Sequence, residues 1–374
     1  MIYLDNAATG GFKIRAVYDT ALTVMKYLSS NPGRSGHRLA VTGAKLIYST
    51  REAIANLFTC SEDRVVFTKN CTEALNTAIF GTVKKGKKVI TTTFEHNSVL
   101  RPLYHLEKQG DITLEIVRPT IQKDIVEAIE EKIDKDTYLI VSTAVSNVTG
   151  EEMPIRKIGE LAKKHNLLFL VDGAQGAGHI PLSLKRDNIS MLALASHKGL
   201  YGIMGSGVLC FSDEVDISPL TFGGTGSDSF LQDMPLAYPE RLEAGTLNLP
   251  AIASLKEGVN YISNNLLHFS EQLEKTTEKI ISRLLEIDRI KLYSKVNKSG
   301  IISFLIDGLD SVTVADKLNA EYDIAVRGGF HCAPLTHKYL NTLNTGLVRA
   351  SLAVQNSAHE ISRFIEAVGK IAKS

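Results

Sequence analysis

Two polar residues follow short apolar runs in the middle of this chain, and they constrain its fold more than any other feature. Asp172 closes the run 167–171, and Lys198 stands three residues after the run 191–195. Runs of this kind, apolar throughout and followed by glycine, are typical of fully buried strands in a parallel sheet. Open α/β sheets bind their ligands at the carboxyl ends of such strands. The sequence therefore predicts that Asp172 and Lys198 line a ligand site.

The segments around this pair alternate between strand and helix patterns, which favours a mostly parallel sheet with helices on both faces. Strands are expected at 64–68, 88–92, 138–142, 167–171, 191–195 and 207–211, and helices at 72–81 and 155–165. We therefore expect an α/β fold whose sheet belongs to a large domain formed by residues 14–250.

Glycine, proline, serine and threonine dominate the stretch from about 220 to 250, which indicates a functional loop or a domain boundary. A long helix is expected at about 251–286, then a strand at 300–305, a helix at 313–320 and a last helix after His359. We expect these elements to form a smaller α+β domain from residues 1–13 and 251–374.

The composition argues against several classes of function. The 374 residues include 42 basic and 41 acidic side chains, a balance that gives no reason to expect nucleic acid or an anionic membrane as partner. No apolar run approaches the roughly 18 residues of a membrane span, and the first residues lack a secretory signal pattern. The four cysteines are too widely spaced for a disulfide framework or a zinc site. A cytoplasmic protein with free thiols and no metal is the simplest interpretation.

A lysine and an aspartate at one sheet edge suit pyridoxal 5'-phosphate. This cofactor needs a lysine amine for its Schiff base and a carboxylate that keeps its ring nitrogen protonated. The alternative is a surface lysine at a strand end, which is the usual place for this residue. Here the apolar run before Lys198 and the glycine-rich segment 199–207 favour a desolvated amine with a lowered pKa.

Four further positions could complete such a site, and each also has a structural interpretation. Thr72, beside Cys71 at a helix start, could cradle a phosphate or simply cap its helix. His96 could lie over a cofactor ring or be a structural histidine. Asn147 could bond a cofactor or shape a turn. Arg349, a lone arginine in an apolar stretch, either pairs internally or binds a substrate carboxylate.

Cys332 differs from the other three cysteines in its surroundings. It follows His331 on a glycine-rich segment that begins at Arg327. An electropositive and mobile setting of this kind favours a thiolate. The alternative is a buried free cysteine, which fits the other three better because each stands in or beside an apolar element.

Taken together, these segments resemble the class V aminotransferase family of fold-type I pyridoxal phosphate enzymes, and within it the cysteine desulfurases and selenocysteine lyases. The resemblance covers essentially the whole chain in the family's order. The matching pieces are 3–9, 31–37, 171–175, 196–198, 243–248 and 349–356. The Arg-x-Gly-x-His-Cys spacing at 327–332 resembles the group II, SufS-like branch.

The resemblance implies a role for each of these positions. Lys198 would hold the cofactor covalently, Asp172 would bond its ring nitrogen, and His96 would stack on its ring. Its remaining contacts would come from Asn147 and Gln175 at the phenolic oxygen, and from Cys71, Thr72, Ser196, His197 and Thr246 of the partner subunit around the phosphate. The substrate would meet Arg349 at its carboxylate, with Asn147, Ala8 and Arg327 nearby, and Cys332 would attack its sulfur.

The implied activity is desulfuration of L-cysteine to L-alanine, with a persulfide on Cys332 for transfer to an acceptor protein, as in iron–sulfur cluster assembly. The implied assembly is a homodimer with its active sites at the subunit interface. Alternatives are a selenocysteine lyase, another class V C–S lyase or aminotransferase, or a non-catalytic binding protein of this fold. Two positions depart from the family pattern and indicate a divergent member: Ala195 replaces a usual Ser or Thr, and Ile203 a usual proline.

Overall fold

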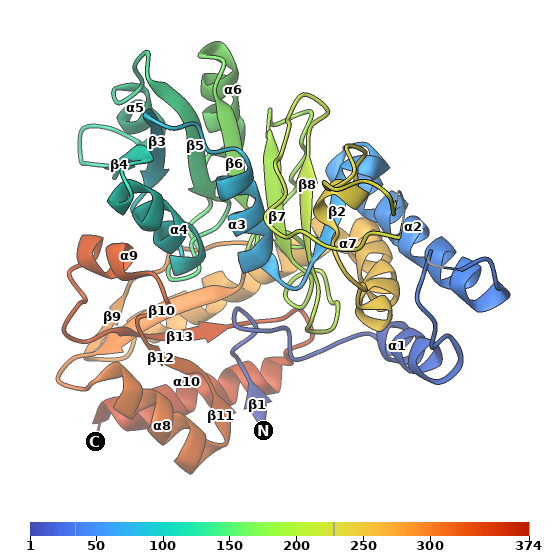
Figure 1. Cartoon of the computed structure of the whole chain (residues 1–374). Coiled ribbons are helices and arrows are strands. Elements are labelled where there is room, and N and C mark those ends of the chain that lie inside the picture. Colours follow the sequence, from blue (N-terminus) through green and yellow to red (C-terminus); the bar gives the residue numbers. More distant parts are fainter. Residues whose placement is uncertain (34, 227–228, 374) are drawn as a thin grey trace.

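A computed structural model describes residues 1–33, 35–226 and 229–373, so Arg34 of the matching segment 31–37 lies outside the described residues. Within them, seven strands form one large sheet in the order β2-β8-β7-β6-β5-β3-β4 (Figure 1). Their bounds are β2 Val65–Thr68, β3 Lys87–Thr92, β4 Ile112–Val117, β5 Thr137–Thr143, β6 Leu168–Asp172, β7 Met191–Ala195 and β8 Gly207–Phe211. Neighbours from β4 to β7 pair in parallel, so the mostly parallel sheet predicted from the sequence is confirmed.

Strand β8 is the exception, because it runs antiparallel to both β7 and β2. The connection from β7 to β8, residues 196–206, contains no crossover helix. A parallel neighbour would require such a crossover, whereas an antiparallel one is reached by a short loop. This loop begins with Ser196-His197-Lys198, the lysine motif, so the change of direction places Lys198 at the carboxyl end of the sheet.

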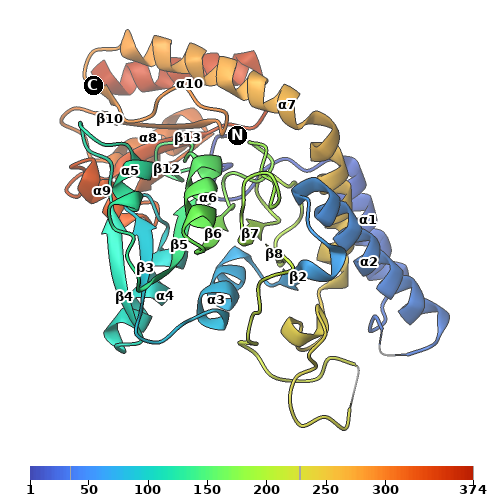
Figure 2. The same ribbon diagram turned by 90° about the horizontal axis from the view of Figure 1, so that it is seen from above.

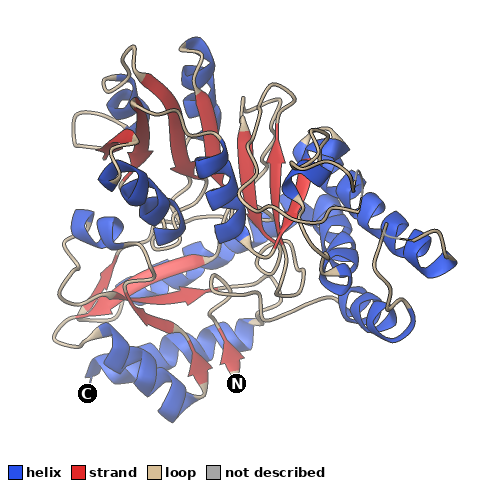
Figure 3. Cartoon of the chain, viewed as in Figure 1, coloured by secondary structure: helices blue, strands red, loops and turns tan. Residues whose placement is uncertain are grey.

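Helices cover both faces of the large sheet, as the view coloured by secondary structure shows (Figure 3). Helices α3 (Cys71–Gly81) and α4 (Asn97–Lys108) bury apolar side chains against one face. The other face packs against α2 (Arg38–Phe58), α6 (Ile155–Lys164) and the first half of α7 (Leu249–Leu285). Strand β5 is buried along its whole length, which explains why its central residues 138–141 are a continuous apolar run rather than an alternating one.

A second, antiparallel sheet lies below the first in Figure 1, with the strand order β12-β13-β10-β9. The elements of this layer are β9 Ile290–Leu292, β10 Ile301–Ile306, β12 Arg327–Gly329, β13 Leu347–Ser351, α8 Ser311–Tyr322, α9 Pro334–Tyr339 and α10 Ala358–Lys373. Strand β1 (Ile2–Tyr3) pairs in parallel with β11 (Ile324–Ala325). The amino-terminal segment is therefore packed with the carboxyl-terminal layer. The remaining helices are α1 Arg15–Tyr27, α5 Ile125–Glu130 and two short 3-10 turns at Glu62–Arg64 and Glu240–Leu242.

Helix α7 joins the two layers, and Figure 2 shows it running beside α10 at one end and reaching α1 and α2 at the other. Its first half contributes Ile252 and Leu255 to the core under the large sheet. Its second half contributes Leu273 and Ile280 to the core of the smaller layer. The division into residues 14–250 and residues 1–13 plus 251–374 stays a prediction, since one helix serves both cores.

Two helix starts and two strand ends meet at the carboxyl edge of the large sheet. Asn70 caps α3 by accepting a hydrogen bond from the Glu73 backbone N–H at 2.9 Å. His96 caps α4 in the same way, accepting from the Ser98 backbone N–H at 3.0 Å. Both caps follow strands and Asp172 ends one, so free N–H groups and polar side chains converge here. In the described part of the chain no helix is long and apolar enough to cross a membrane.

Candidate active site

A cavity of about 110 Å³ lies at this edge of the large sheet. Its lining brings together eight positions named from the sequence: Cys71, Thr72, His96, Asn147, Asp172, Gln175, His197 and Lys198. Larger hollows of about 500 and 480 Å³ lie elsewhere on the chain, and neither contains any of the eight. We place the site by its converging chemical groups rather than by volume, because a reaction depends on those groups.

The Asp172 carboxylate is oriented by contacts to only one of its two oxygens. The Ala174 backbone N–H donates to Oδ1 at 2.9 Å, and the Cys71 thiol lies 3.6 Å from the same oxygen. Within the described residues, Oδ2 accepts no hydrogen bond. Asp172 lines the cavity, and a carboxylate oxygen there without a donor is well suited to a protonated ring nitrogen, which would supply the missing hydrogen bond.

The Lys198 amine has neither a hydrogen bond nor an ion pair with any of the described residues, although its side chain lines the cavity. Burial lowers the pKa of Lys198, while the negative charge of Asp172 acts in the opposite direction. A lysine with a lowered pKa has a larger fraction of free amine, which is the form that attacks a carbonyl carbon. Asp172 and Lys198 therefore line one cavity, and each has a polar atom without a hydrogen-bond partner among the described residues.

His96 is neutral and fixed in orientation. Burial lowers the pKa of His96 to about 4, and its Nδ1 accepts from the Ser98 backbone. The Ser98 hydroxyl lies 2.9 Å from His96 Nδ1 and 2.9 Å from the Thr72 hydroxyl. Hydroxyls and helix-start N–H groups from α3 and α4 thus surround one end of the cavity, a setting that favours an anion such as phosphate.

Arg349 pairs internally, and it keeps unused donors as well. It lies on β13, is 1% exposed, and its Nη2 donates to Asp5 Oδ1 at 2.9 Å. Its Nη1 donates to the backbone carbonyl of Asn147 at 2.9 Å. The Nε–H is buried and has no hydrogen-bond partner among the described residues. Internal pairing is therefore what the structure shows, and binding of a substrate carboxylate by Arg349 stays a prediction, since its unpaired Nε–H is buried and the residue does not line the cavity.

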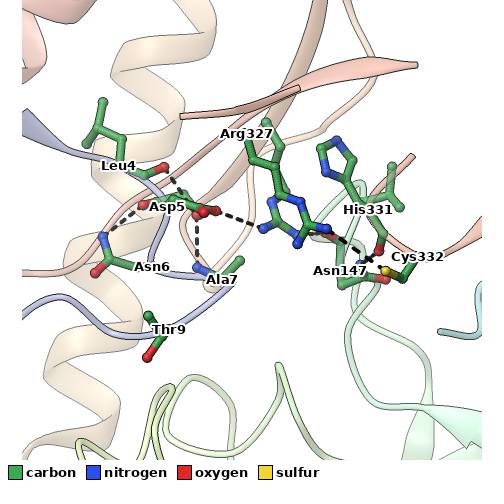
Figure 4. Close-up of polar contacts among 12 residues, drawn as sticks. Leu4, Asp5, Asn6, Ala7, Thr9, Asn147, Arg327, His331 and Cys332 are labelled. Carbon is green, nitrogen blue, oxygen red and sulfur yellow. Dashed lines mark hydrogen bonds and ion pairs between the residues drawn. The ribbon is translucent and has the colours of Figure 1, made fainter. Parts of the chain in front are cut away.

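Cys332 is exposed and lies on a loop held by the walls of the site (Figure 4). The Asn147 side-chain amide donates to the His331 carbonyl at 2.7 Å, and the Asn97 backbone N–H donates to the Cys332 carbonyl at 2.8 Å. The Arg327 guanidinium lies 3.9 Å from the Cys332 sulfur. Cys71 and Cys210 are buried and Cys60 is partly buried, so Cys332 is the accessible thiol of the four.

Six of the positions named from the sequence lie outside the cavity lining: Ala8, Ser196, Thr246, Arg327, Cys332 and Arg349. Ser196 is fully buried and its hydroxyl has no partner in the described part of the chain, whereas its neighbour Ala195 lines the cavity. Successive residues of an extended segment point to opposite sides. The hydroxyl that Ala195 lacks is therefore not replaced by Ser196 in this structure. Thr246 accepts a hydrogen bond from Asn31 at 3.3 Å, away from the cavity of its own chain.

The amino-terminal segment holds the lysine motif in place, a role that the sequence patterns did not reveal. The His197 carbonyl accepts from the Gly10 backbone N–H at 2.9 Å and from the Lys13 amine at 3.0 Å. The Thr9 hydroxyl lies 3.0 Å from His197 Nδ1. The only signal for these contacts was the match of residues 3–9 to the family, because contacts between distant segments leave no periodicity.

Glu95 was also missed, although it lies beside His96. It is fully buried, and its Oε1 accepts from the Thr92 hydroxyl at 2.6 Å and from the Thr143 backbone N–H at 3.0 Å. Its Oε2 has no partner among the described residues. Burial raises the pKa of Glu95 to about 8, against the effect of those two hydrogen bonds. The side chain is thus a neutral acid at pH 7 that ties the ends of β3 and β5 together.

The Glu95→Gln variant is expected to remove a pH dependence of stability. The folded chain holds this proton up to pH 8 or so while the unfolded chain loses it near pH 4.5, so the parent's free energy of unfolding falls as pH rises between them. Relative to the variant, the parent should lose about 3 kcal/mol between pH 5 and pH 7.5. Urea unfolding followed by circular dichroism measures this difference. Exposed Glu278→Gln is the control, and parallel pH curves for parent and Glu95→Gln would contradict the assignment.

Comparison with known proteins places the chain among described relatives. The family model "Aminotransferase class-V" matches residues 2–364. A probable cysteine desulfurase of Pyrococcus abyssi is 33% identical, with 100% of this chain and 95% of that protein covered. One from Methanothermobacter thermautotrophicus is 32% identical, with 99% and 94% covered. The apo structure of a cysteine desulfurase from Thermococcus onnurineus has a TM-score of 0.93 at 31% identity, covering 100% of this chain and 94% of that one.

Proposed function

We propose that this chain, which belongs to the class-V aminotransferase family, is a pyridoxal 5'-phosphate-dependent cysteine desulfurase. Relatives that cover it from end to end carry that activity in their names. The observation that carries the proposal is the unpaired Lys198 amine, which shares a cavity with an Asp172 oxygen that lacks a donor. Cys332 stands on a loop bonded to the same site through Asn147.

The residues present fit the cofactor that this family generally uses. Lys198 would hold it covalently, and the open Asp172 oxygen would face its ring nitrogen. The neutral His96 ring would stack on it, and Asn147 and Gln175 would bond its phenolic oxygen side. The hydroxyls of Thr72 and Ser98, with His197 and the start of α3, would receive its phosphate. Cys71 would support Asp172 from behind, since its sulfur contacts the other carboxylate oxygen.

The residues of this chain then divide the reaction among them. The bound cofactor withdraws electrons from the substrate's α-carbon. Arg349 uses its spare N–H groups to bind the carboxylate, and the Lys198 amine removes the α-proton. The Cys332 thiolate forms an S–S bond to the substrate sulfur while the C–S bond breaks, leaving its electron pair on the β-carbon. That carbon takes a proton and Lys198 returns a proton to the α-carbon, so the products are alanine and a persulfide on Cys332.

Several finer points are part of the same proposal. The enzyme acts as a homodimer, in which Thr246 of the partner subunit completes the phosphate site, since Thr246 lies away from the cavity of its own chain. The persulfide passes to a sulfur-acceptor protein. Assignment to group II rests on the spacing from Arg327 to Cys332, and a cytoplasmic location stays a prediction.

Product analysis tests the proposal directly. The full chain with added pyridoxal 5'-phosphate is incubated with L-cysteine, L-cystine and L-selenocysteine, and alanine, pyruvate and keto acids are quantified. We expect alanine from cysteine, and sulfide in equal amount when a reductant is present. Alanine from selenocysteine alone would favour a selenocysteine lyase, and pyruvate or a keto acid another lyase or an aminotransferase. A chain that neither binds the cofactor nor turns over any of the three would be a binding protein, against the proposal.

A further inference from the structure

Asn147 touches both the proposed cofactor site and the loop that carries Cys332. It lines the cavity, and its side-chain Nδ2 donates to the His331 carbonyl at 2.7 Å (Figure 4). The bond is well protected, because Asn147 is 8% exposed and His331 is 2% exposed. Among the described residues, the Asn147 side-chain oxygen and the second hydrogen of its amide have no partner. One amide can therefore bond the loop and a cofactor oxygen at the same time.

The loop it holds has an unfavourable backbone conformation. His331 has φ of 50° and Cys332 has φ of 58°, so two successive residues with side chains lie in the left-handed region. Such residues keep this conformation only where their surroundings impose it. In the described part of the chain, three hydrogen bonds join the backbone carbonyls and the imidazole of these two residues to other segments: the Asn147 amide to the His331 carbonyl, the Asn97 N–H to the Cys332 carbonyl, and His331 Nε2 with the Leu347 carbonyl at 3.0 Å. Within the loop, the Ala333 N–H donates to the Phe330 carbonyl at 3.0 Å, and the Arg327 guanidinium contacts the Cys332 sulfur.

Only one of these three bonds comes from a side chain that faces the cofactor cavity. The Asn97 and Leu347 contacts use backbone atoms of α4 and β13, which are fixed by the fold. The Asn147 amide is at the end of a side chain whose free hydrogen and oxygen are available to a ligand. It is also anchored from behind, since Arg349 donates to its backbone carbonyl at 2.9 Å. Ligand binding in the cavity can thus change the strength of the hydrogen bond between the Asn147 amide and the His331 carbonyl.

We propose that Asn147 is a positioning residue that couples cofactor binding to the conformation of the Cys332 loop, acting through the His331 carbonyl. The inference rests on the proposed function, because it takes the cofactor's phenolic oxygen as the second partner of the amide. A bound cofactor orients the amide and so strengthens its bond to the loop. Linkage requires the reverse as well: a loop in place improves cofactor binding by the same factor.

Gln175 provides a matched control at the same cavity. Its side-chain Nε2 donates to the Ala7 carbonyl at 2.8 Å, so it holds the amino-terminal segment rather than the Cys332 loop. Like Asn147, it is buried, lines the cavity and is expected to bond the cofactor. Removing either amide costs the cofactor one contact. Only the loss of Asn147 should separate the cofactor from the loop.

Hydrogen exchange of the full chain tests the coupling. Amide exchange in the peptide 328–334 is measured by mass spectrometry with and without pyridoxal 5'-phosphate, for the parent, Asn147→Ala, Asn147→Asp, Gln175→Ala and Gln175→Glu. Loading is checked by absorbance, with enough cofactor to saturate each variant. In the parent and both Gln175 variants, loading should slow exchange of this peptide about three- to tenfold, the size of one hydrogen bond to a neutral group. In both Asn147 variants the cofactor should leave the exchange rate unchanged.

Two outcomes would overturn the inference. The first is equal slowing in the parent and the Asn147 variants, which would mean that the cofactor acts on the loop by another route. The second is that the cofactor no longer slows exchange in the Gln175 variants either, which would mean that the loss of any one cofactor contact abolishes the slowing. Exchange rates do not depend on turnover. A parent that forms no alanine would therefore reject the proposed function, whereas the exchange rates would still decide whether Asn147 couples cofactor binding to the loop.

Discussion

Replacing Lys198 with alanine is expected to lower alanine formation from L-cysteine by a factor of at least about 10⁴. The amine both holds the cofactor covalently and removes the α-proton in the proposed reaction. In the described part of the chain no other lysine lines the cavity, so none can substitute for it. The rate is measured with cofactor in excess, and the visible absorption band of the covalently held cofactor, recorded on the same samples, should disappear.

Lys69→Ala is the matched lysine control for this experiment. Lys69 stands just before α3, close in sequence to the cavity, but its side chain is 84% exposed and pairs with Glu73. This variant should keep the parent's rate and absorption band. Thermal unfolding of Lys198→Ala confirms that the chain is folded. Retention of more than about a tenth of the parent's rate by folded Lys198→Ala would be inconsistent with an essential amine.

Replacing Cys332 with serine is expected to reduce alanine formation from L-cysteine by about 10³-fold or more, because a hydroxyl is a far weaker nucleophile than a thiolate at neutral pH. The side chain is exposed, so the exchange of sulfur for oxygen should leave stability nearly unchanged. The cofactor absorption band should also persist, since Cys332 lies outside the cavity lining. Loss of activity with retained cofactor would place the defect in sulfur transfer.

The same variant separates the leading proposal from its alternative. Selenium is a better leaving atom than sulfur and need not depend on a protein thiol, so a selenocysteine lyase would keep its rate with selenocysteine when Cys332 is lost. Mass spectrometry of the parent after brief exposure to L-cysteine should find the added sulfur on Cys332. The partly buried Cys60, changed to serine, serves as the control. Equal turnover of cysteine by the parent and Cys332→Ser would rule out the persulfide step.

The elements around the site could be anticipated because their signals are local. Continuous apolar runs followed by polar residues predicted β6 and β7; β7 has the expected bounds, and β6 lies one residue later than expected and includes Asp172. The expected helix at 72–81 begins one residue earlier, at Cys71, because Asn70 is the cap. The antiparallel direction of β8 was not anticipated, since a strand's sequence carries little information about its neighbour's direction.

The assignment of individual contacts was less complete, for a geometric reason. Ser196 stood in the lysine motif as a phosphate contact, yet its hydroxyl is buried away from the cavity and Ala195 faces it. Ser98 was not singled out, although its hydroxyl lies 2.9 Å from both His96 Nδ1 and the Thr72 hydroxyl. One step along an extended segment reverses the direction of a side chain, so a motif identifies a segment better than it identifies the atom that makes a contact.

By itself, the sequence determined the class of fold and the groups available for chemistry, because short stretches of residues are enough to indicate buried strands and capped helices. It supplied Lys198, Asp172 and Cys332 in an order shared with a known family. Only the tertiary structure decided which polar side chains of the site keep an atom without a hydrogen-bond partner. Asp172 has one oxygen without a donor, Arg349 has an unpaired Nε–H, and Asn147 bonds the Cys332 loop with one hydrogen of its amide while the other has no partner among the described residues. Such properties depend on what distant segments place beside each atom, and no local pattern records that.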